Sequence, residues 1–467
     1  MTFQHPTFLL FFPIALVAYH LAAASFRVQN AIVALSGLVF YGWFSPALCL
    51  LLVAYAVVAY VGGRWVGALP EESPARRRAL ALVVSVLALG LAVFKYFDFF
   101  QSAARATLSA LGLAPGWPVV EVLLPLGLSF YCFQSIAYVV DVHRRVIEPE
   151  RDPVTFAAFM FFFPQLVAGP IARAPLVLRQ FQRPRTLTRD KVGEAIWLLL
   201  FGYFSKAVAA DTLAGYVDIA FQPSAHTTGW VVLFAAVGFV LQVYFDFNGY
   251  SLIAKGTARL FGVELAWNFD RPYWSTSIQE FWRRWHITLG NWLRDYLYLP
   301  LGGGSHGELR AAFSLILTMA IAGVWHGVGW TYLVWGAAHG VALAVHRSFH
   351  IHFPRVRISA AMGWLLTMLF VAPTFFVFRA PSLEVAAELL ASCDRWHWRP
   401  FDTAAWLAAL ATSIPIFAIE AWQSRRRDLL APARIGFVPF SLLAAALLVA
   451  VFARFWGTEH RFIYAQF

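Results

Sequence analysis

The sequence predicts an all-α integral membrane protein, and three observations lead to this fold class. Apolar residues make up 60% of the 467 positions, and charged residues make up only 13%, about half the fraction found in a soluble domain. The apolar residues fall into runs long enough to cross a bilayer as helices. The net charge of +11 is spread over the short loops between these runs, which is the positive-inside pattern and not the long basic face of a nucleic-acid-binding protein.

We therefore expect about 11–12 transmembrane helices, with re-entrant and interfacial helices, around a central tunnel. No polar linker divides the apolar runs, so residues 1–467 are predicted to form a single membrane domain. The first run, 7–24, has no Lys or Arg before it, whereas a cleavable signal peptide begins with a positive segment. We expect an uncleaved span with an extracytoplasmic amino end, which places the basic loops in the cytoplasm. The further predicted spans lie near residues 31–44, 47–66, 79–97, 119–140, 192–209, 229–247, 311–330, 331–347, 360–378, 402–422 and 437–456.

One apolar segment, 154–171, does not fit a simple crossing. It is broken by Pro164, Gly169 and Pro170, and both of its flanks are basic. A single crossing would leave one basic flank outside, so we predict a re-entrant or interfacial segment in which 162–173 lines an entrance to the protein. An ordinary kinked span is the alternative.

Polar chemistry concentrates in the stretch 281–340, which opens FWRRWHITLGNWLRDYLYLPLGGG and closes GVWHGVGWTYLVWGAAHG. Its first half mixes charged and aromatic residues, which favours interfacial helices at the cytoplasmic boundary. Such a surface suits the phosphates and adenine of coenzyme A, an acidic carrier protein or anionic lipid heads. The binding candidates in this half, besides His286, are Arg283, Arg284, Trp285, Asn291, Arg294 and Asp295.

The second half contains a charge-free run, 311–325, that ends in Trp325 and His326. A histidine in such a place is costly unless it is partnered or wetted, and a neutral imidazole can take a proton from a hydroxyl group. Flanking glycines would let a bulky substrate approach the backbone. The alternative is a histidine that bonds a carbonyl group and packs helices together.

Two further polar candidates, Asp246 and Asn248, lie near the end of the apolar run 229–247. An acidic residue there is a candidate site residue, but it could also cap the next helix or pair with an arginine of the stretch 281–340. The three cysteines show no ligand spacing, and the histidines between 346 and 352 have no Glu or Cys at ligand spacing. We predict no metal site, no disulfide and no bound cofactor.

The segments 123–145, 162–173 and 244–251, followed by the two motifs of 281–340, resemble in this order the membrane-bound O-acyltransferase superfamily. The similar branch is the bacterial one of alginate O-acetylation and D-alanyl transfer to teichoic acids. The motif-bearing core covers about residues 120–350, and the helices of 360–467 match least. The resemblance implies that His326 is catalytic and that His286 is a second functional residue.

The resemblance further implies an enzyme of the bacterial inner membrane that moves an acetyl group from a cytoplasmic thioester, acetyl-CoA, to an extracytoplasmic polysaccharide. A partner resembling SGNH hydrolases would assist outside the membrane. His326 would act as general base, and the His286 imidazole or a backbone amide would stabilise the oxyanion. D-alanyl transfer from a carrier protein, transfer to a protein or lipid, and a transporter or export channel without acyl transfer remain alternatives. A nucleic-acid partner is not expected.

Overall fold

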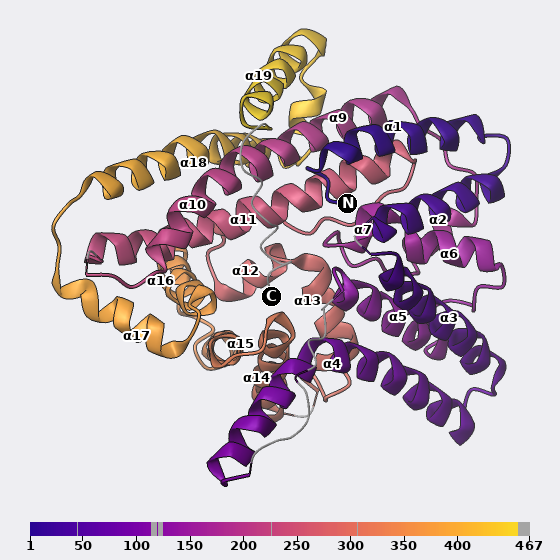
Figure 1. The fold of residues 1–467 in the computed structure, drawn as a ribbon, viewed down its shortest axis with the longest axis horizontal. Helices are drawn as coiled ribbons and strands as arrows, with labels where there is room; N and C mark the ends of the chain where they lie inside the picture. Colours follow the sequence, from indigo (N-terminus) through magenta and orange to yellow (C-terminus); the bar gives the residue numbers. More distant parts are fainter. Residues whose placement is uncertain (44, 114–118, 120–124, 226, 306, 456–467) are drawn as a thin grey trace. The chain divides into compact units, whose positions relative to one another are not determined.

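The computed structural model describes residues 1–43, 45–113, 119, 125–225, 227–305 and 307–455, and every regular element in these ranges is a helix (Figure 1). The all-α fold class is therefore confirmed. In these ranges 8 helices are long and apolar enough to cross a membrane. They are Pro46–Ala68, Pro74–Ala110, Arg189–Ala220, Gly229–Leu260, Glu308–His326, Ala360–Arg379, Pro400–Arg426 and Phe437–Arg454.

The other predicted spans correspond to shorter or more polar helices. α1 (Pro6–Leu21), α2 (Phe26–Gly42) and α5 (Leu128–His143) have 16, 17 and 16 residues, and α15 (Trp330–His352) carries several histidines. Positions 120–124 of the predicted span 119–140, and position 456 of the last one, lie outside the described residues.

Contacts between Cα atoms divide the chain into two compact units, Met1–Leu187 with Phe261–Leu265 and Thr188–Leu260 with Ala266–Phe467. The first unit contains α1, α2, α3 (Pro46–Ala68), α4 (Pro74–Ala110), α5, α6 (Pro153–Phe161), α7 (Phe163–Leu166) and α8 (Leu178–Phe181). The second unit contains the remaining helices. The single domain over 1–467 stays a prediction.

In the first unit the segment 154–171 is broken, as its prolines and glycine predict. The α-helix α6 ends at Phe161, the four-residue α7 follows, and irregular backbone leads to α8. The side-chain amides of Gln134 and Gln165 donate to the carbonyl of Phe159 at 2.9 and 2.7 Å. These bonds satisfy a buried carbonyl next to the break, which is how irregular backbone is tolerated away from water.

The second unit is built from long helices that run in alternating directions. α9 (Arg189–Tyr203) continues through a π-helical stretch into α10 (Asp211–Ala220), and α11 (Gly229–Leu260) returns beside it. The expected span 229–247 is thus too short. The helix α11 contains 32 residues and extends to Leu260, so YFDFNGYS lies inside it. The later helices are α12 (Ile278–Arg284), α13 (Ile287–Leu293), α14 (Glu308–His326), α15, α16 (Ala360–Arg379), α17 (Leu383–Ala391), α18 (Pro400–Arg426) and α19 (Phe437–Phe455).

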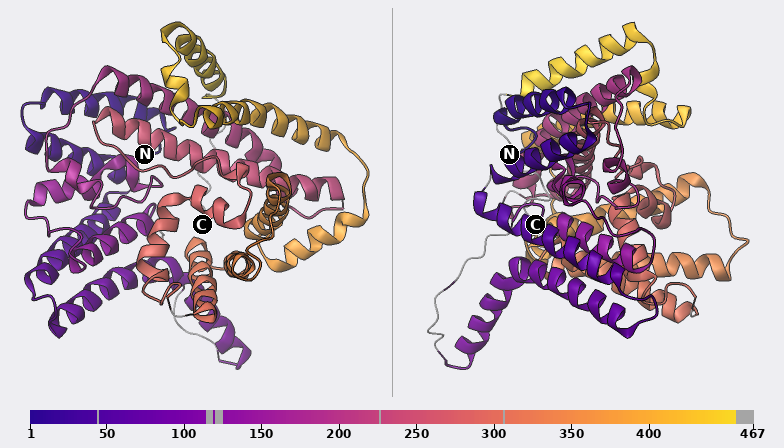
Figure 2. Two further views of the ribbon diagram at one scale, coloured as in Figure 1. Left: turned by 180° about the vertical axis from the view of Figure 1, so that it is seen from behind. Right: turned by 90° about the vertical axis from the view of Figure 1, so that its right-hand side faces the viewer.

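This alternation gives the second unit two distinct ends, and the views in Figure 2 follow the same helices from behind and from the side. At one end, called the His326 end, Arg379 pairs with Asp218 at 2.7 Å, and the backbone amide of Gly229 donates to the carbonyl of Arg395 at 2.7 Å. At the other, called the arginine end, Glu194 pairs with Arg259 at 2.7 Å. The exposed arginines of the arginine end include Arg355, Arg357, Arg425, Arg426 and Arg427.

Candidate active site

His326 is the last residue of α14, and close packing of α14 on α15 fixes its place. A Cβ atom added to Gly336 would lie 2.3 Å from the carbonyl oxygen of Met319, and one added to Gly323 would lie 2.2 Å from that of Tyr332. Glycine is therefore required at both positions, since the two backbones touch there. The α14–α15 hairpin brings the motif Trp325–His326 against α15.

The replacement Gly336→Ala is expected to destabilise the protein by about 1–3 kcal/mol, because the methyl group overpacks the α14–α15 contact. The matched replacement Gly215→Ala in α10 meets no atom within 4 Å and should stabilise by about 0.4–1 kcal/mol. Thermal unfolding of the two detergent-solubilised variants measures the difference. Equal unfolding temperatures for the two variants would contradict this account of the hairpin.

The His326 side chain is buried in an aromatic box, with the residue 4% exposed. Its ring centroid lies 4.7 Å from Trp325, 5.2 Å from Trp335 and 5.4 Å from Phe378. A Cβ atom at Gly327 would lie 2.3 Å from the Tyr332 ring. The space beside Gly327 is thus filled by a side chain, so at this glycine helix packing and not substrate access explains the residue type.

His286 lies between α12 and α13, outside the candidate spans, in a left-handed conformation with φ 41° that non-glycine residues rarely adopt. Its Nδ1 lies 3.0 Å from Oδ1 of Asn268. The same oxygen accepts from the Thr288 hydroxyl at 2.8 Å, and the Asn268 amide donates to Ser251 Oγ at 3.1 Å. Asn268 is therefore oriented with its oxygen toward the imidazole, and Nδ1 of His286 must donate the hydrogen.

This network decides the protonation state of His286. The side chain is 1% exposed, and burial lowers the pKa of His286 to about 3, so the ring is neutral near pH 7. With the single proton on Nδ1, Nε2 presents a lone pair. Nε2 of the neutral ring can thus accept a hydrogen bond, whereas an oxyanion needs a donor.

The structure places both predicted histidines beside one indole. The Trp325 ring lies 6.5 Å from His286 and 4.7 Å from His326, and Phe247 packs edge-on against His286 at 4.6 Å. The neighbouring Trp285 is 2% exposed and stacks among Phe269, Phe281 and Phe375 at 5.1–5.5 Å. Trp285 therefore belongs to the wall behind His286.

The charged candidates in and next to α12 and α13 are more exposed than the two histidines, and two of the arginines form ion pairs. Arg284 pairs with Glu280 at 2.6 Å, Arg294 pairs with Asp295 at 2.7 Å, and Arg283 is exposed. Asn291 is half-buried. An interfacial setting suits these residues, but Phe281, Trp285 and His286 are buried inside the second unit, so the interfacial expectation holds for only one side of this segment.

Asp246 is buried and pairs with Lys206 of the preceding span at 2.7 Å, and Lys206 also reaches Asp211 at 2.6 Å. Pairing with an arginine of 281–340 was one alternative for Asp246, and the structure pairs it with this lysine. Asn248, 7% exposed, lines a small cavity of about 20 Å³ together with Arg271 and Glu420.

Sequence reasoning missed Asn268 and Glu420. Asn268 precedes α12 in an irregular segment, and Glu420 lies in α18, where it accepts from Tyr244 and, at 2.9 Å, from Nε1 of Trp274. A buried carboxyl group inside an apolar span was the signal for Glu420. A third buried histidine, His339, bonds Trp282 at 3.2 Å and Thr374 at 3.1 Å through its two ring nitrogens.

Comparison with known proteins gives a consistent family. A model of the membrane-bound O-acyltransferase family, MBOAT, matches residues 150–386, which include both histidines. The chain is 39% identical over 393 residues to the probable alginate O-acetylase AlgI of Azotobacter vinelandii, covering 84% of this chain and 78% of that protein. It is 32% identical over 430 residues to a peptidoglycan O-acetyltransferase of Helicobacter pylori, covering 84% and 79%. A teichoic acid D-alanyltransferase of Streptococcus thermophilus is 28% identical over 235 residues, covering 47% of this chain and 56% of that protein.

Proposed function

Because this chain belongs to the membrane-bound O-acyltransferase family, we propose that it moves an acetyl group from cytoplasmic acetyl-CoA toward an extracytoplasmic polysaccharide. The chain is a multi-pass membrane O-acyltransferase. The observation that supports acetyl and polysaccharide is the extent of similarity to the two O-acetylating relatives, which covers 84% of the chain, against 47% and 60% for two teichoic acid D-alanyltransferases. A partner resembling SGNH hydrolases would complete the transfer outside.

The charge at the two ends of the second unit supports the orientation. The exposed arginines of the arginine end favour a cytoplasmic location for that end by the positive-inside rule. The His326 end then faces outward. His326, the last residue of α14, would therefore lie on the side of the membrane where the acceptor is found. The amino terminus is proposed to be extracytoplasmic, because the basic loops between the predicted spans are expected to be cytoplasmic.

The orientation predicts which introduced cysteines a membrane-impermeant maleimide labels on intact cells, in a background without the three native cysteines. His397→Cys, in the loop at the His326 end, should be labelled directly. Ser424→Cys, at the arginine end, should be labelled only after the membrane is permeabilised. The reverse pattern would overturn the orientation.

In the proposed reaction His326 takes the proton of the acceptor hydroxyl as its oxygen attacks the thioester carbonyl. When the tetrahedral intermediate collapses, the carbon–sulfur bond breaks and the leaving thiolate takes that proton from the His326 imidazolium. In the tautomer assigned to His286, Nε2 has no hydrogen to donate, so we assign the oxyanion to a backbone amide of the turn at Gly327–Gly329.

Inverted membrane vesicles test the donor. With the protein present and a polysaccharide fragment enclosed in the vesicle lumen, acetyl-CoA added outside should release free thiol in proportion to ester formed on the fragment, and a D-alanyl carrier protein should not replace it. Thiol release with the D-alanyl carrier alone would assign the chain to aminoacyl transfer. No thiol release with either donor, combined with polymer passage, would favour the transporter alternative.

A further inference from the structure

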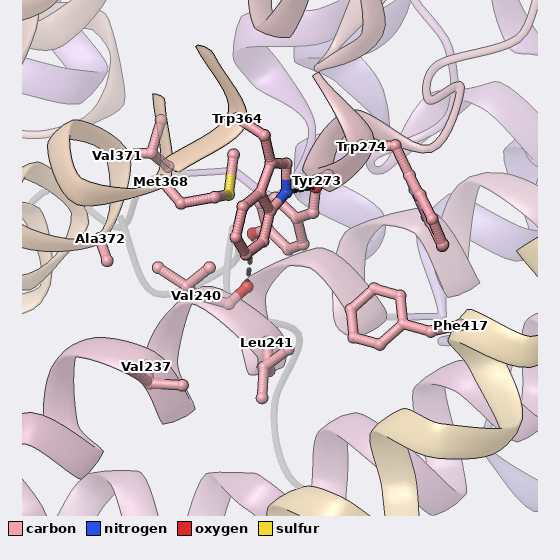
Figure 3. Close-up of a pocket in the computed structure, with 10 residues that line it drawn as sticks. All are labelled: Val237, Val240, Leu241, Tyr273, Trp274, Trp364, Met368, Val371, Ala372 and Phe417. Atoms are coloured by element: carbon pink, nitrogen blue, oxygen red, sulfur yellow. Dashed lines mark hydrogen bonds between the residues drawn. The ribbon is translucent and has the colours of Figure 1, made fainter. Parts of the chain in front are cut away.

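A second feature of the same unit is an apolar cavity of about 610 Å³. Figure 3 shows it between α11, α16 and α18, with Tyr273 and Trp274 on one side. The lining residues are Val237, Val240, Leu241, Tyr273, Trp274, Trp364, Met368, Val371, Ala372 and Phe417.

The polar hydrogens of this lining are already paired within the protein. The Tyr273 hydroxyl donates to the carbonyl of Val240 at 2.6 Å, and Nε1 of Trp364 donates to the carbonyl of Tyr273 at 2.8 Å. Nε1 of Trp274 donates to Glu420 at 2.9 Å. A polar ligand would therefore find no donor to bind and would lose its hydration, whereas a hydrocarbon chain loses nothing.

The cavity also lies at the depth of an acyl chain. α11, α16 and α18 are candidate membrane spans. Trp364 and Ala372 lie about 6 and 18 Å along α16 from its first residue, and Phe417 lies about 14 Å from the last residue of α18, at 1.5 Å per residue. One leaflet of the hydrocarbon core is about 15 Å thick, so a chain that enters at the arginine end would pass Trp364 and Phe417, and its methyl end would reach Ala372 near the bilayer midplane.

The positive charge of the exposed arginines at the arginine end favours a lipid with an anionic head group. Arg355 and Arg357 precede α16, and Arg425 to Arg427 end α18, so exposed cations flank both helices that border the cavity. A phosphate at this level would be attracted to them. We infer that the cavity holds one acyl chain of an anionic phospholipid of the cytoplasmic leaflet, with its phosphate at these arginines.

The bound chain would support the wall behind His286. The Tyr273 ring stacks on Trp285 at 6.0 Å, and Phe375, one turn from Val371 on α16, contacts Trp285 at 5.2 Å. The site is distinct from acyl transfer, and its test requires no acyl donor.

The test uses the wild-type protein in vesicles that contain phosphatidylglycerol with a diazirine near the methyl end of one acyl chain. After illumination, mass spectrometry should find adducts on Val237, Val240 and Ala372. Adducts confined to the outward-facing Leu369 and Ile414, which are 63% and 62% exposed, would show ordinary annular lipid and overturn the inference.

Two variants sharpen the result. Ala372→Trp should remove the adducts on Val237 and Val240, whereas Leu369→Trp on the outer face of α16 should leave them unchanged. The double variant Arg355→Gln, Arg357→Gln should lose the preference for the phosphatidylglycerol probe over a phosphatidylcholine probe. Adducts that persist in Ala372→Trp, or a preference unchanged by the loss of both arginines, would contradict the assignment.

Discussion

Replacement of His326 by alanine is expected to lower acyl transfer by about 100-fold to 10,000-fold, the range typical for loss of a general base. The side chain is 4% exposed and is held by Trp325, Trp335 and Phe378, so no solvent base can replace it easily. The measurement is thiol release from acetyl-CoA by inverted vesicles, at matched amounts of folded protein.

The control for this variant is a histidine that lies on the surface. The side chain of His352 is 57% exposed, and His352→Ala should retain full activity. Because a cavity is left at position 326, thermal unfolding of His326→Ala must also be compared with wild type. A folded His326→Ala protein with wild-type activity would remove His326 from the chemistry.

Replacement of Asn268 by leucine is expected to lower the rate by roughly 5-fold to 150-fold, which corresponds to about 1–3 kcal/mol for a buried donor left without its acceptor. The loss acts through His286, whose Nδ1 lies 3.0 Å from Asn268. Without that acceptor the ring can adopt the other tautomer, in which Nε2 carries the proton. Asn268 is thus a positioning residue.

The variant Asn268→Asp distinguishes this role from simple packing. A carboxylate beside Nδ1 would stabilise the imidazolium ion and raise the pKa of His286 from about 3. Since a base is lost when it is protonated, the acid limb of the pH–rate profile should move to higher pH, with activity recovered in alkaline buffer. An unchanged profile in a folded Asn268→Asp protein would mean that Asn268 only fills space.

The sequence predicted the helical class, because that class depends on local patterns, and the catalytic roles of the two histidines stay predictions. Hydropathy predicts spans directly, and the motif around His326 stands at the end of a charge-free run. Sequence-based prediction failed where the environment of a residue depends on a partner that is distant in the sequence. Asp246 appeared to end a span, but Lys206 pairs with it at 2.7 Å, and the neutralised pair lets α11 continue.

Asn268 illustrates a second limit. It lies in an irregular segment that contacts the first residue of α13: the backbone amide of Ile287 donates to the carbonyl of Asn268 at 2.8 Å. No period or motif in the sequence indicates such a contact. The depth of α12 was missed for a related reason, since the charged residues of one face suggested an interface while Phe281 and Trp285 pack into the interior.

The most direct test of acyl transfer across the membrane is the ester content of the surface polysaccharide in cells that express wild type, His326→Ala or His352→Ala. The amount of exported polymer is measured in the same cultures, with each protein confirmed in the membrane. We predict that ester disappears only in the His326→Ala cells, while polymer export continues in all three. Ester that remains in the His326→Ala cells while polymer export falls would contradict acyl transfer and indicate a transporter.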